Sequence, residues 1–229
     1  FHCPARTSHL CRGIPDAHLE ELFATSAKVH LKPGETLILD GDEALTTYNV
    51  ISGTMRLTRL GSDGRRQILA FLFTGNYIGL TADQTYHFNA EAVTDVELCA
   101  FDRKRLDTLF RLHPDMEKEF RQMAGKILET ANELLFTLGR RTAVERVATF
   151  LLFLMDAQRV PCEAAPEQRR VSVPMTRTDI ADYLGLTIET VSRAISKLKR
   201  DKVIHLVNAH EIEITNYPRL RRLAAAEVE

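Results

Sequence analysis

The segment from Thr187 to Arg200 carries side chains whose chemistry suits the groove of a nucleic acid. Its apolar residues Val191, Ile195 and Leu198 recur at helical spacing and predict an amphipathic helix. An arginine can donate a bidentate pair to guanine, a glutamate can accept from a cytosine amine, and serine or threonine can reach bases or phosphates. The residues expected to point outward supply all these groups: Glu189, Thr190, Ser192, Arg193, Ser196 and Lys197. This mixture favours base reading over the alternative of an ordinary solvated helix face.

A cluster of cations follows at the end of the same helix and in the next loop. Its members are Lys197, Lys199, Arg200 and Lys202. Phosphate contacts from such residues position a helix on DNA without carrying sequence information. Residues 139–229 hold 15 Lys+Arg and 12 Asp+Glu, a net charge of +3, whereas residues 1–138 hold 15 and 19, a net charge of −4. The C-terminal part is therefore the one expected to meet a polyanion.

Two short helices and a hairpin are expected to position these residues. The run TRTDIADYLG, from Thr176 to Gly185, predicts a first helix that the glycine ends, and Thr187 is a candidate N-cap for the second. Two helices joined across a glycine-containing turn form a helix-turn-helix. The segments VIHLV and EIEIT, separated by residues 208–210, predict a hairpin that forms a wing beside it.

The N-terminal half has a different pattern. From Glu35 to Asp102, short β-rich segments alternate with turn residues, and the pairs Gly41-Asp42, Asp63-Gly64 and Gly75-Asn76 are natural turn centres. Strands of this length with regular turns predict an antiparallel roll or barrel. A helix from Asp16 to Ala24, with Asp16 as its cap, is expected before it.

A long helix is expected after Pro114. Its apolar face repeats at spacings of four and three and comprises Met116, Phe120, Met123, Ile127, Thr130, Leu134 and Leu138. Such an a/d seam of about three heptads predicts a homodimer contact. The interface residues expected from it are Met123, Ile127, Thr130 and Leu134. Packing of this face on the roll is the alternative, and flanking Leu135 and Phe136 widen the stripe enough for both.

Together these patterns predict an α+β protein of three parts. We expect an N-terminal antiparallel β-roll sensor domain in residues 1–112, a long dimerisation helix in 113–139, and a winged helix-turn-helix DNA-binding domain in 140–229. Within the last part, a largely buried helix is expected over 143–157, followed by a loop. The composition, 45% hydrophobic and 27% charged, suits globular domains, and no apolar run approaches the roughly 20 residues of a membrane span. The protein is expected to be cytoplasmic.

The run MTRTDIADYLGLTIETVSRAISKLKRDKVI closely resembles the DNA-binding motif of the CRP/FNR superfamily, in its FNR/FixK branch. The resemblance covers nearly the whole chain and implies a cyclic-nucleotide-binding-like roll, a dimerisation helix and a winged helix-turn-helix, in that order. Glu189, Ser192 and Arg193 match the E-x-x-S-R signature with which FNR-type proteins read TTGAT-type half-sites. The cAMP-responsive branch typically carries glycine in place of that serine.

The roll is not expected to bind a cyclic nucleotide. Members of the superfamily that do so use a Gly-Glu pair and an arginine that binds the phosphate. Here Leu80 follows Gly79, and no arginine or lysine lies between Arg66 and Arg103. A phosphate buried there would lack a cationic partner, which is costly.

Four cysteines raise the question of a metal centre. Cys3 and Cys11 alone are weak evidence, and Cys99 in the strand VELCAF is more often a core thiol. The resemblance implies more, because FNR-type oxygen sensors hold a 4Fe-4S cluster with three N-terminal cysteines and one in the roll. Cys99 resembles the latter, and Cys3 and Cys11 resemble the second and third cysteines of a C-x2-C-x7-C pattern.

The fourth ligand is not in this sequence. The chain opens with Phe1 rather than methionine, so we expect native residues before it, among them the missing cysteine. The alternative is a cluster-free FixK-like regulator controlled mainly by its abundance. Cys162, in a loop beside two prolines, fits no ligand pattern and is interpreted as a non-ligand thiol.

The leading function is thus a homodimeric transcription regulator on a palindromic operator in double-stranded DNA, linked to oxygen limitation. The family makes RNA polymerase a partner and the Asp63-Gly64-Arg65 hairpin a candidate surface for it; a charged β-turn is the alternative. An enzyme built on the roll is not favoured, because no H-x-H or paired-carboxylate group converges on one pocket. The histidines considered for it are scattered: His30, His87, His113, His205 and His210.

Overall fold

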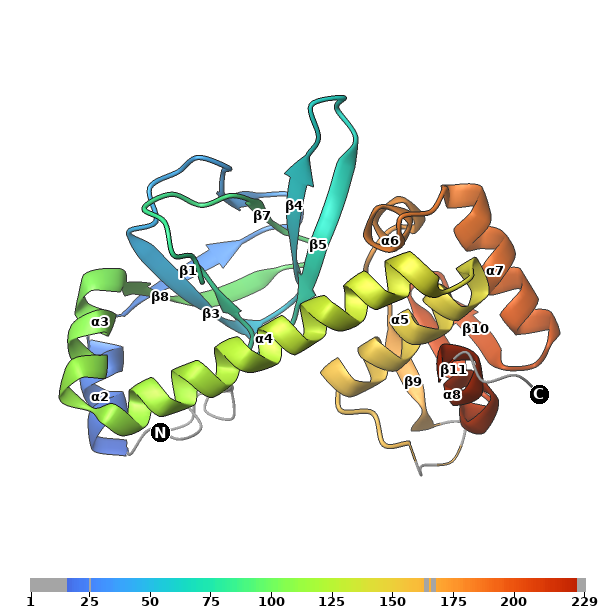
Figure 1. Ribbon diagram of the computed structural model, residues 1–229. Helices are drawn as coiled ribbons and strands as arrows, with labels where there is room; N and C mark the ends of the chain where they lie inside the picture. Colours follow the sequence, from blue (N-terminus) through green and yellow to red (C-terminus); the bar gives the residue numbers. More distant parts are fainter. Residues whose placement is uncertain (1–15, 25, 163–164, 166–167, 226–229) are drawn as a thin grey trace. The chain divides into compact units, whose positions relative to one another are not determined.

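The computed structural model describes residues 16–225 apart from 25, 163–164 and 166–167. The chain divides into two compact units, one up to Thr130 and one from Ala131 onward. The division falls inside the longest helix, α4 (Pro114–Arg140), which therefore contributes to both units (Figure 1).

The first unit is built on two four-stranded antiparallel sheets, as the sequence predicts (Figure 1). One has the order β1-β8-β3-β6 and the other β2-β7-β4-β5. The strands are β1 (Ala27–Leu31), β2 (Thr36–Ile38), β3 (Thr46–Ser52), β4 (Met55–Leu60), β5 (Arg66–Leu72), β6 (Tyr77–Ile78), β7 (Asn89–Ala92) and β8 (Val96–Asp102). Strand β1 lies before the predicted β-rich stretch, which begins at Glu35, and is fixed by long-range pairing with β8; the two-residue β6 likewise depends on its pairing with β3.

Two hydrophobic clusters stabilise this unit. The first contains residues of both sheets, among them Ile38, Met55, Ile78 and Leu98, and Tyr86 belongs to it. The second joins one sheet to three helices: the predicted α2 (Asp16–Ala24), the unpredicted α3 (Arg103–Leu112) and the start of α4. Its buried residues are Leu19, Leu22, Ile51, Tyr77, Cys99, Phe101, Leu106, Leu109, Met116 and Met123.

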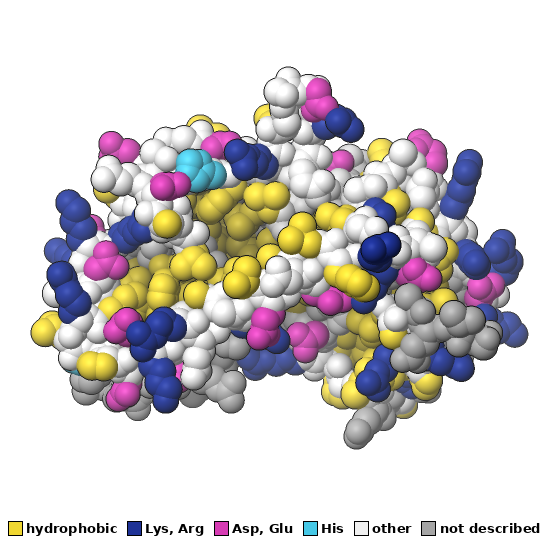
Figure 2. Space-filling model, viewed as in Figure 1, with side chains coloured by type: hydrophobic (Ala, Val, Ile, Leu, Met, Phe, Trp, Pro, Cys, Tyr) yellow, Lys and Arg dark blue, Asp and Glu magenta, His cyan; other side chains and the backbone are white. Residues whose placement is uncertain are grey.

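Helix α4 confirms the helix expected after Pro114, and its predicted seam divides into two environments. Met123 is only 3% exposed and packs in the second cluster of its own unit. Ile127 and Thr130 are exposed, and Leu134 is half-buried. The exposed apolar stripe therefore begins at Ile127, and Figure 2 shows hydrophobic side chains following α4. Its large members are Ile127, Leu128, Leu135 and Phe136.

The second unit contains the predicted helices and wing. After the end of α4 it comprises α5 (Ala143–Ala157), β9 (Arg170–Ser172), α6 (Arg177–Leu184), α7 (Ile188–Arg200), β10 (Ile204–Asn208), β11 (Glu211–Ile214) and α8 (Tyr217–Ala225). The bounds of α5 match the prediction, and Val147, Phe150, Leu151 and Leu154 are buried in it. The wing has a third strand, β9, which pairs with β11 and was not predicted; α8 was not predicted either.

Candidate nucleic-acid interface

Helix α6 begins with a capping box. The Thr176 hydroxyl accepts a hydrogen bond from the Asp179 N–H at 3.1 Å, and the Asp179 carboxylate accepts from the Thr176 N–H at 3.1 Å. The Thr176 hydroxyl also donates to that carboxylate at 2.8 Å. The two bonds from backbone N–H groups satisfy donors that the helix leaves unpaired. Asp179 is 1% exposed, and these contacts give its buried carboxylate hydrogen-bond donors, which offset the cost of burying its charge.

The turn between α6 and α7 depends on Gly185. This residue is the C-cap of α6 and has φ +59°, in the left-handed region that glycine adopts without steric cost. The Leu186 N–H then donates to the Ala181 carbonyl at 3.0 Å. Thr187 is the N-cap of α7, as predicted, since its hydroxyl accepts from the Thr190 N–H at 3.2 Å. The turn and the start of the second helix are therefore defined by local contacts.

Helix α7 has two distinct faces. Val191, Ala194, Ile195 and Leu198 are buried against the rest of the unit. The opposite face is exposed and carries Glu189, Ser192, Arg193, Ser196, Lys197 and Lys199. Glu189, Ser192, Arg193 and Ser196 follow the spacing of three and four that places residues in one stripe. The structure thus brings the signature residues together on one accessible surface, which we call the α7 stripe.

Thr190 has a different environment from the residues of the α7 stripe. Its side chain is half-buried, and its hydroxyl lies 2.9 Å from that of Thr187. The two threonine hydroxyls therefore form a polar pair at the first turn of α7. A base or phosphate contact from Thr190 would compete with this local bond.

The charge distribution along α7 is asymmetric. The pKa of the Glu189 carboxyl is held below its ordinary value by a hydrogen bond from its own backbone N–H, by the Thr187 hydroxyl and by the charge of Arg193. At neutral pH this carboxylate is therefore an acceptor only. Lys197, Lys199 and Arg200 occupy the last turn, where cations also interact favourably with the negative end of the helix dipole. Figure 2 shows Lys and Arg side chains gathered over this part of the unit.

Lys202 adopts an uncommon backbone conformation just after α7. Its φ is +53°, and its carbonyl accepts a hydrogen bond from the Thr215 hydroxyl at 2.9 Å. A residue with a Cβ is strained in the left-handed region. The tight connection from α7 to the wing therefore keeps a lysine in a conformation that suits glycine, and this cation is exposed beside the end of the helix.

In the first unit, the interior of the roll is filled by apolar side chains, among them the aromatic ring of Tyr86. Tyr86 is 3% exposed and its hydroxyl donates to the Thr46 carbonyl, while Phe88 packs against it with ring centroids 5.6 Å apart. Burial raises the pKa of Tyr86 to about 12. Arg103, the nearest cation after Arg66 in sequence, donates to the carbonyls of Thr81, Asp83 and Ala44. Its guanidinium is thus engaged by the backbone around the same segment.

Of the predicted cluster ligands, Cys3 and Cys11 lie outside the described residues. Cys99 is buried, on β8, paired in register with Lys28 and Asn49. Within residues 16–225 as described, no three His, Cys, Asp or Glu side chains are grouped closely enough to hold a metal ion. One thiolate cannot hold a 4Fe-4S cluster, so the described residues alone do not provide that site. Cys162 is exposed.

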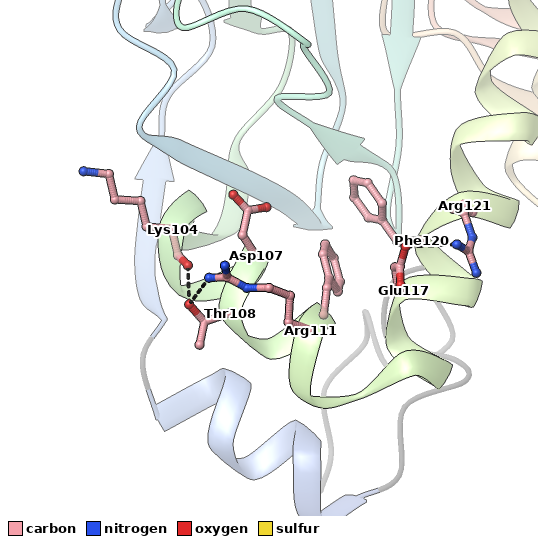
Figure 3. A pocket seen from close by; sticks show the side chains of 8 residues that line it. Lys104, Asp107, Thr108, Arg111, Glu117, Phe120 and Arg121 are labelled. Carbon is pink, nitrogen blue, oxygen red and sulfur yellow. Dashed lines mark hydrogen bonds and ion pairs between the residues drawn. The ribbon is translucent and has the colours of Figure 1, made fainter.

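A groove of about 730 Å³ lies between α3 and the first turns of α4 (Figure 3). Phe110 and Phe120 line it, with ring centroids 4.7 Å apart. Two of its charged groups pair with each other, Arg121 with Glu117 at 2.9 Å, and Arg111 donates to the Thr108 hydroxyl at 3.3 Å. The predicted DNA-reading residues do not line this groove.

Sequence reasoning missed one residue that shapes the interface. Arg146, on α5, donates from its guanidinium to the Leu184 carbonyl, at the end of α6, at 2.8 Å. An arginine in a mostly apolar helix matches no local motif, and only the tertiary fold shows its role. The described residues include no helix of the length and apolarity that a membrane crossing requires.

Comparison with known proteins agrees with this geometry. Residues 145–223 match the model of the Crp-like helix-turn-helix domain, and residues 28–113 match that of the cyclic nucleotide-binding domain. The nitrogen fixation regulation protein FixK of Bradyrhizobium diazoefficiens is 37% identical over 98% of this chain and 93% of its own length. The transcriptional activator protein FnrL of Cereibacter sphaeroides is 34% identical over 95% and 88%.

Solved structures show the same relationship. The structure of FixK2 from Bradyrhizobium japonicum has a TM-score of 0.80 and 34% identity, and the match covers 89% of this chain and 99% of that one. These relatives are regulators of transcription rather than enzymes. The chain therefore belongs to the FNR/FixK branch of the CRP/FNR superfamily of DNA-binding transcription regulators.

Proposed function

We propose that this regulator reads a palindromic operator with TTGAT-type half-sites through the α7 stripe. Glu189, Ser192 and Arg193 contact base edges, with Arg193 on the guanine and Glu189 on a cytosine amine. Thr187, Thr190, Ser196, Lys197 and Lys199 contact phosphates or flanking bases. The observation that carries the proposal is the exposure of Glu189, Ser192 and Arg193 on one stripe, opposite a fully packed face of a capped helix.

The proposal includes a homodimer joined along α4. Ile127, Leu128 and Leu135 are large apolar side chains that are 39%, 63% and 66% exposed in the single chain. Thr130 and Leu134 continue the same helix, whereas Met123 already serves the core of its own unit. A second α4 packed in the same way would bury this stripe. It would also place two recognition helices for successive half-sites, about 34 Å apart.

The roll takes no cyclic nucleotide in this account. Tyr86 and the other apolar residues of the first cluster occupy its interior, and Arg103 is held by backbone carbonyls. Calorimetry with millimolar cAMP should show no saturable heat. A saturable site whose affinity depends on the phosphate would contradict this part of the proposal.

For the signal, we propose a 4Fe-4S cluster on Cys3, Cys11, Cys99 and one cysteine upstream of Phe1. The supporting observation is that Cys99 shares a buried cluster with Met116 and Met123 of α4, so a change at this thiol would reach the proposed dimer helix. The alternative is a cluster-free FixK-like regulator controlled mainly by its abundance. RNA polymerase is the proposed partner in activation, with the exposed Asp63–Arg65 turn between β4 and β5 as its candidate contact.

The test of the DNA proposal is fluorescence anisotropy with a labelled palindrome of two TTGAT half-sites and a duplex of scrambled half-sites. Specific binding should exceed non-specific binding by at least about a thousandfold at physiological salt. Equal affinity for the two duplexes would contradict sequence reading. An affinity for the scrambled duplex that falls steeply as the salt concentration rises would still show phosphate contacts.

A further inference from the structure

The guanidinium of Arg146 connects the ends of two helices. Its Nη2 donates to the Leu138 carbonyl in the last turn of α4 at 2.8 Å, and its Nη1 donates to the Leu184 carbonyl at the end of α6 at 2.8 Å. The Nε donates to the Arg141 carbonyl at 2.9 Å, and Nη1 also lies 3.5 Å from the Gly185 carbonyl. We call this group of contacts the helix junction.

The chemistry of these acceptors explains why an arginine occupies the junction. The last carbonyls of a helix have no partner within the helix and carry partial negative charge. Two such ends meet one cation, which itself lies in the second turn of α5 and is half-buried. The planar guanidinium offers five donors in a fixed fork, so that each of its three nitrogens binds a different carbonyl. A lysine ammonium at the end of a flexible chain cannot reproduce this fork.

A second arginine makes the same corner rigid. Arg141 has a side chain 9% exposed, forms an ion pair with Glu133 at 2.8 Å, and donates to the hydroxyls of Thr137 and Thr149 at 2.6 and 2.9 Å. Its guanidinium also lies 5.3 Å from the ring centroid of Phe136. The bonds to Thr137 and Thr149 tie the end of α4 to α5, which carries Arg146. The end of α4 is therefore joined to α5 by side-chain hydrogen bonds within the second unit.

The junction contacts the turn that leads into α7. A Cβ added to Gly185 would lie 3.5 Å from Leu138 Cδ2 and 3.6 Å from Arg146 Nη1, so the turn packs closely on both. Only Leu186 and the N-cap Thr187 separate this glycine from α7. Any displacement of the Leu184 and Gly185 carbonyls would thus move the start of the α7 stripe relative to the end of α4.

We propose that Arg146 is a positioning residue for DNA reading, which sets the placement of α7 relative to the end of α4 without touching DNA. The inference rests on the proposed function of the α7 stripe. The proposed dimer contact lies earlier on the same helix, so the end of α4 connects that contact to the helix junction. By holding the turn before α7 against the end of α4, Arg146 would determine where Arg193 lies in the DNA groove for a given dimer geometry.

The test compares Arg146→Lys with Arg140→Lys in the full chain; Arg140 is an exposed arginine at the last residue of α4. At a temperature well below thermal unfolding, Arg146→Lys should lower affinity for the TTGAT palindrome about tenfold and change affinity for the scrambled duplex less than about twofold. Arg140→Lys should change neither duplex more than about twofold. Equal losses of Arg146→Lys on both duplexes, or no loss, would overturn the proposal.

A double-mutant cycle separates positioning from general loss of stability. In the wild-type background, Arg193→Ala should reduce discrimination for the half-site guanine by about tenfold or more. In the Arg146→Lys background, Arg193→Ala should reduce this discrimination by less than about threefold, because a misplaced Arg193 already contacts the guanine poorly. Additive effects would contradict a positioning role. If Arg146→Lys does not fold, Arg146→Gln, which keeps two donors, takes its place with the same readouts.

A measurement without DNA tests the helix junction separately from the proposed function. Hydrogen exchange of the Leu186 amide and of the first turn of α7 should be faster in Arg146→Lys than in wild type, and unchanged in Arg140→Lys. Faster exchange in a protein that does not discriminate the palindrome would support the junction and contradict the DNA proposal. Discrimination that survives Arg146→Lys with unchanged exchange would do the reverse.

Discussion

Glu189 and Arg193 lie one helical turn apart on the exposed face of α7, and the charge of Arg193 contributes to the low pKa of the Glu189 carboxyl. The larger contributions come from the backbone N–H of Glu189 and the Thr187 hydroxyl. The N-cap that starts the helix therefore also keeps its first acidic side chain ionised. An acceptor and a bidentate donor are presented together, which suits the single G·C pair of a TTGAT half-site, with its guanine on one strand and its cytosine amine on the other.

This arrangement predicts the pH dependence of base discrimination. Because its pKa is lowered, Glu189 stays ionised even at a pH near or somewhat below the ordinary pKa of a glutamate. Its charge is lost only as the pH falls through the pKa of this carboxyl in the folded protein. Discrimination at the base pair read by Glu189 should therefore be constant from pH about 8 to about 5.5. Anisotropy with the cognate and a single-base variant duplex measures it, and their affinity ratio cancels general effects of histidine protonation. A ratio that already falls between pH about 7 and about 6 would contradict the prediction.

The dimer proposal predicts the effect of a charge on the α4 stripe. Ile127→Glu would place a carboxylate at a contact that the partner desolvates, so the variant should be monomeric and bind the operator poorly. Sedimentation velocity at micromolar concentration measures the oligomeric state. Gln122→Glu, at another exposed position of α4, is the control and should remain dimeric. An Ile127→Glu protein that stays dimeric would place the interface elsewhere.

The strained backbone at Lys202 predicts a stabilising substitution. The left-handed conformation costs a residue with a Cβ about 1–2 kcal/mol, and glycine regains most of this despite its larger loss of entropy on folding. Lys202→Gly should therefore raise the free energy of unfolding by roughly 0.5–1 kcal/mol, seen as a higher Tm.

Lys202→Ala is the matched control for this prediction. It removes the same cation but keeps the Cβ, so it should not raise the Tm. Both variants should weaken binding to cognate and scrambled DNA by similar factors if Lys202 contacts phosphate. Equal Tm values for the two variants would show that the φ of +53° stores no strain.

How far the sequence predicted the fold depends on the range of the interactions that form each element. Helices α5, α6 and α7 each have a threonine N-cap beside their own apolar residues, α4 has a repeating apolar face, and all four were predicted. Strand β1 was not predicted, because its pairing partner β8 is about 70 residues away and its own side chains are mostly exposed. Strand β9 has three residues and likewise depends on its partner β11.

The candidate site shows the same division. The α7 stripe follows from spacing on one helix, and the N-cap at Thr187 from local sequence. The role of Arg146 could not be predicted, because its acceptors lie on α4 and α6 as well as just before its own helix. Met123 fits the heptad pattern as well as Ile127 does, and only the fold shows that it lies in a buried cluster with residues of α2, α3 and one sheet.

The cluster proposal predicts the iron content of the native full-length protein purified without oxygen. It should carry oxygen-labile iron and sulfide, and Cys99→Ser should abolish both because a cluster depends on all its thiolates. Cys162→Ser, which changes an exposed thiol outside the ligand pattern, is the control and should leave them intact. Absence of iron after anaerobic reconstitution, or iron that survives Cys99→Ser, would favour the cluster-free alternative.

Base reading by Arg193 is tested most directly by measuring Arg193→Ala on three duplexes: the TTGAT palindrome, the same palindrome with the half-site guanine replaced, and a scrambled sequence. We expect Arg193→Ala to lose roughly 1–3 kcal/mol of binding free energy on the palindrome, to change little on the other two duplexes, and to relax the preference at the guanine. Lys199→Ala, an exposed cation on the same helix, should instead weaken all three alike. An equal loss for Arg193→Ala on all three duplexes would contradict the assignment of the α7 stripe as the surface that reads DNA.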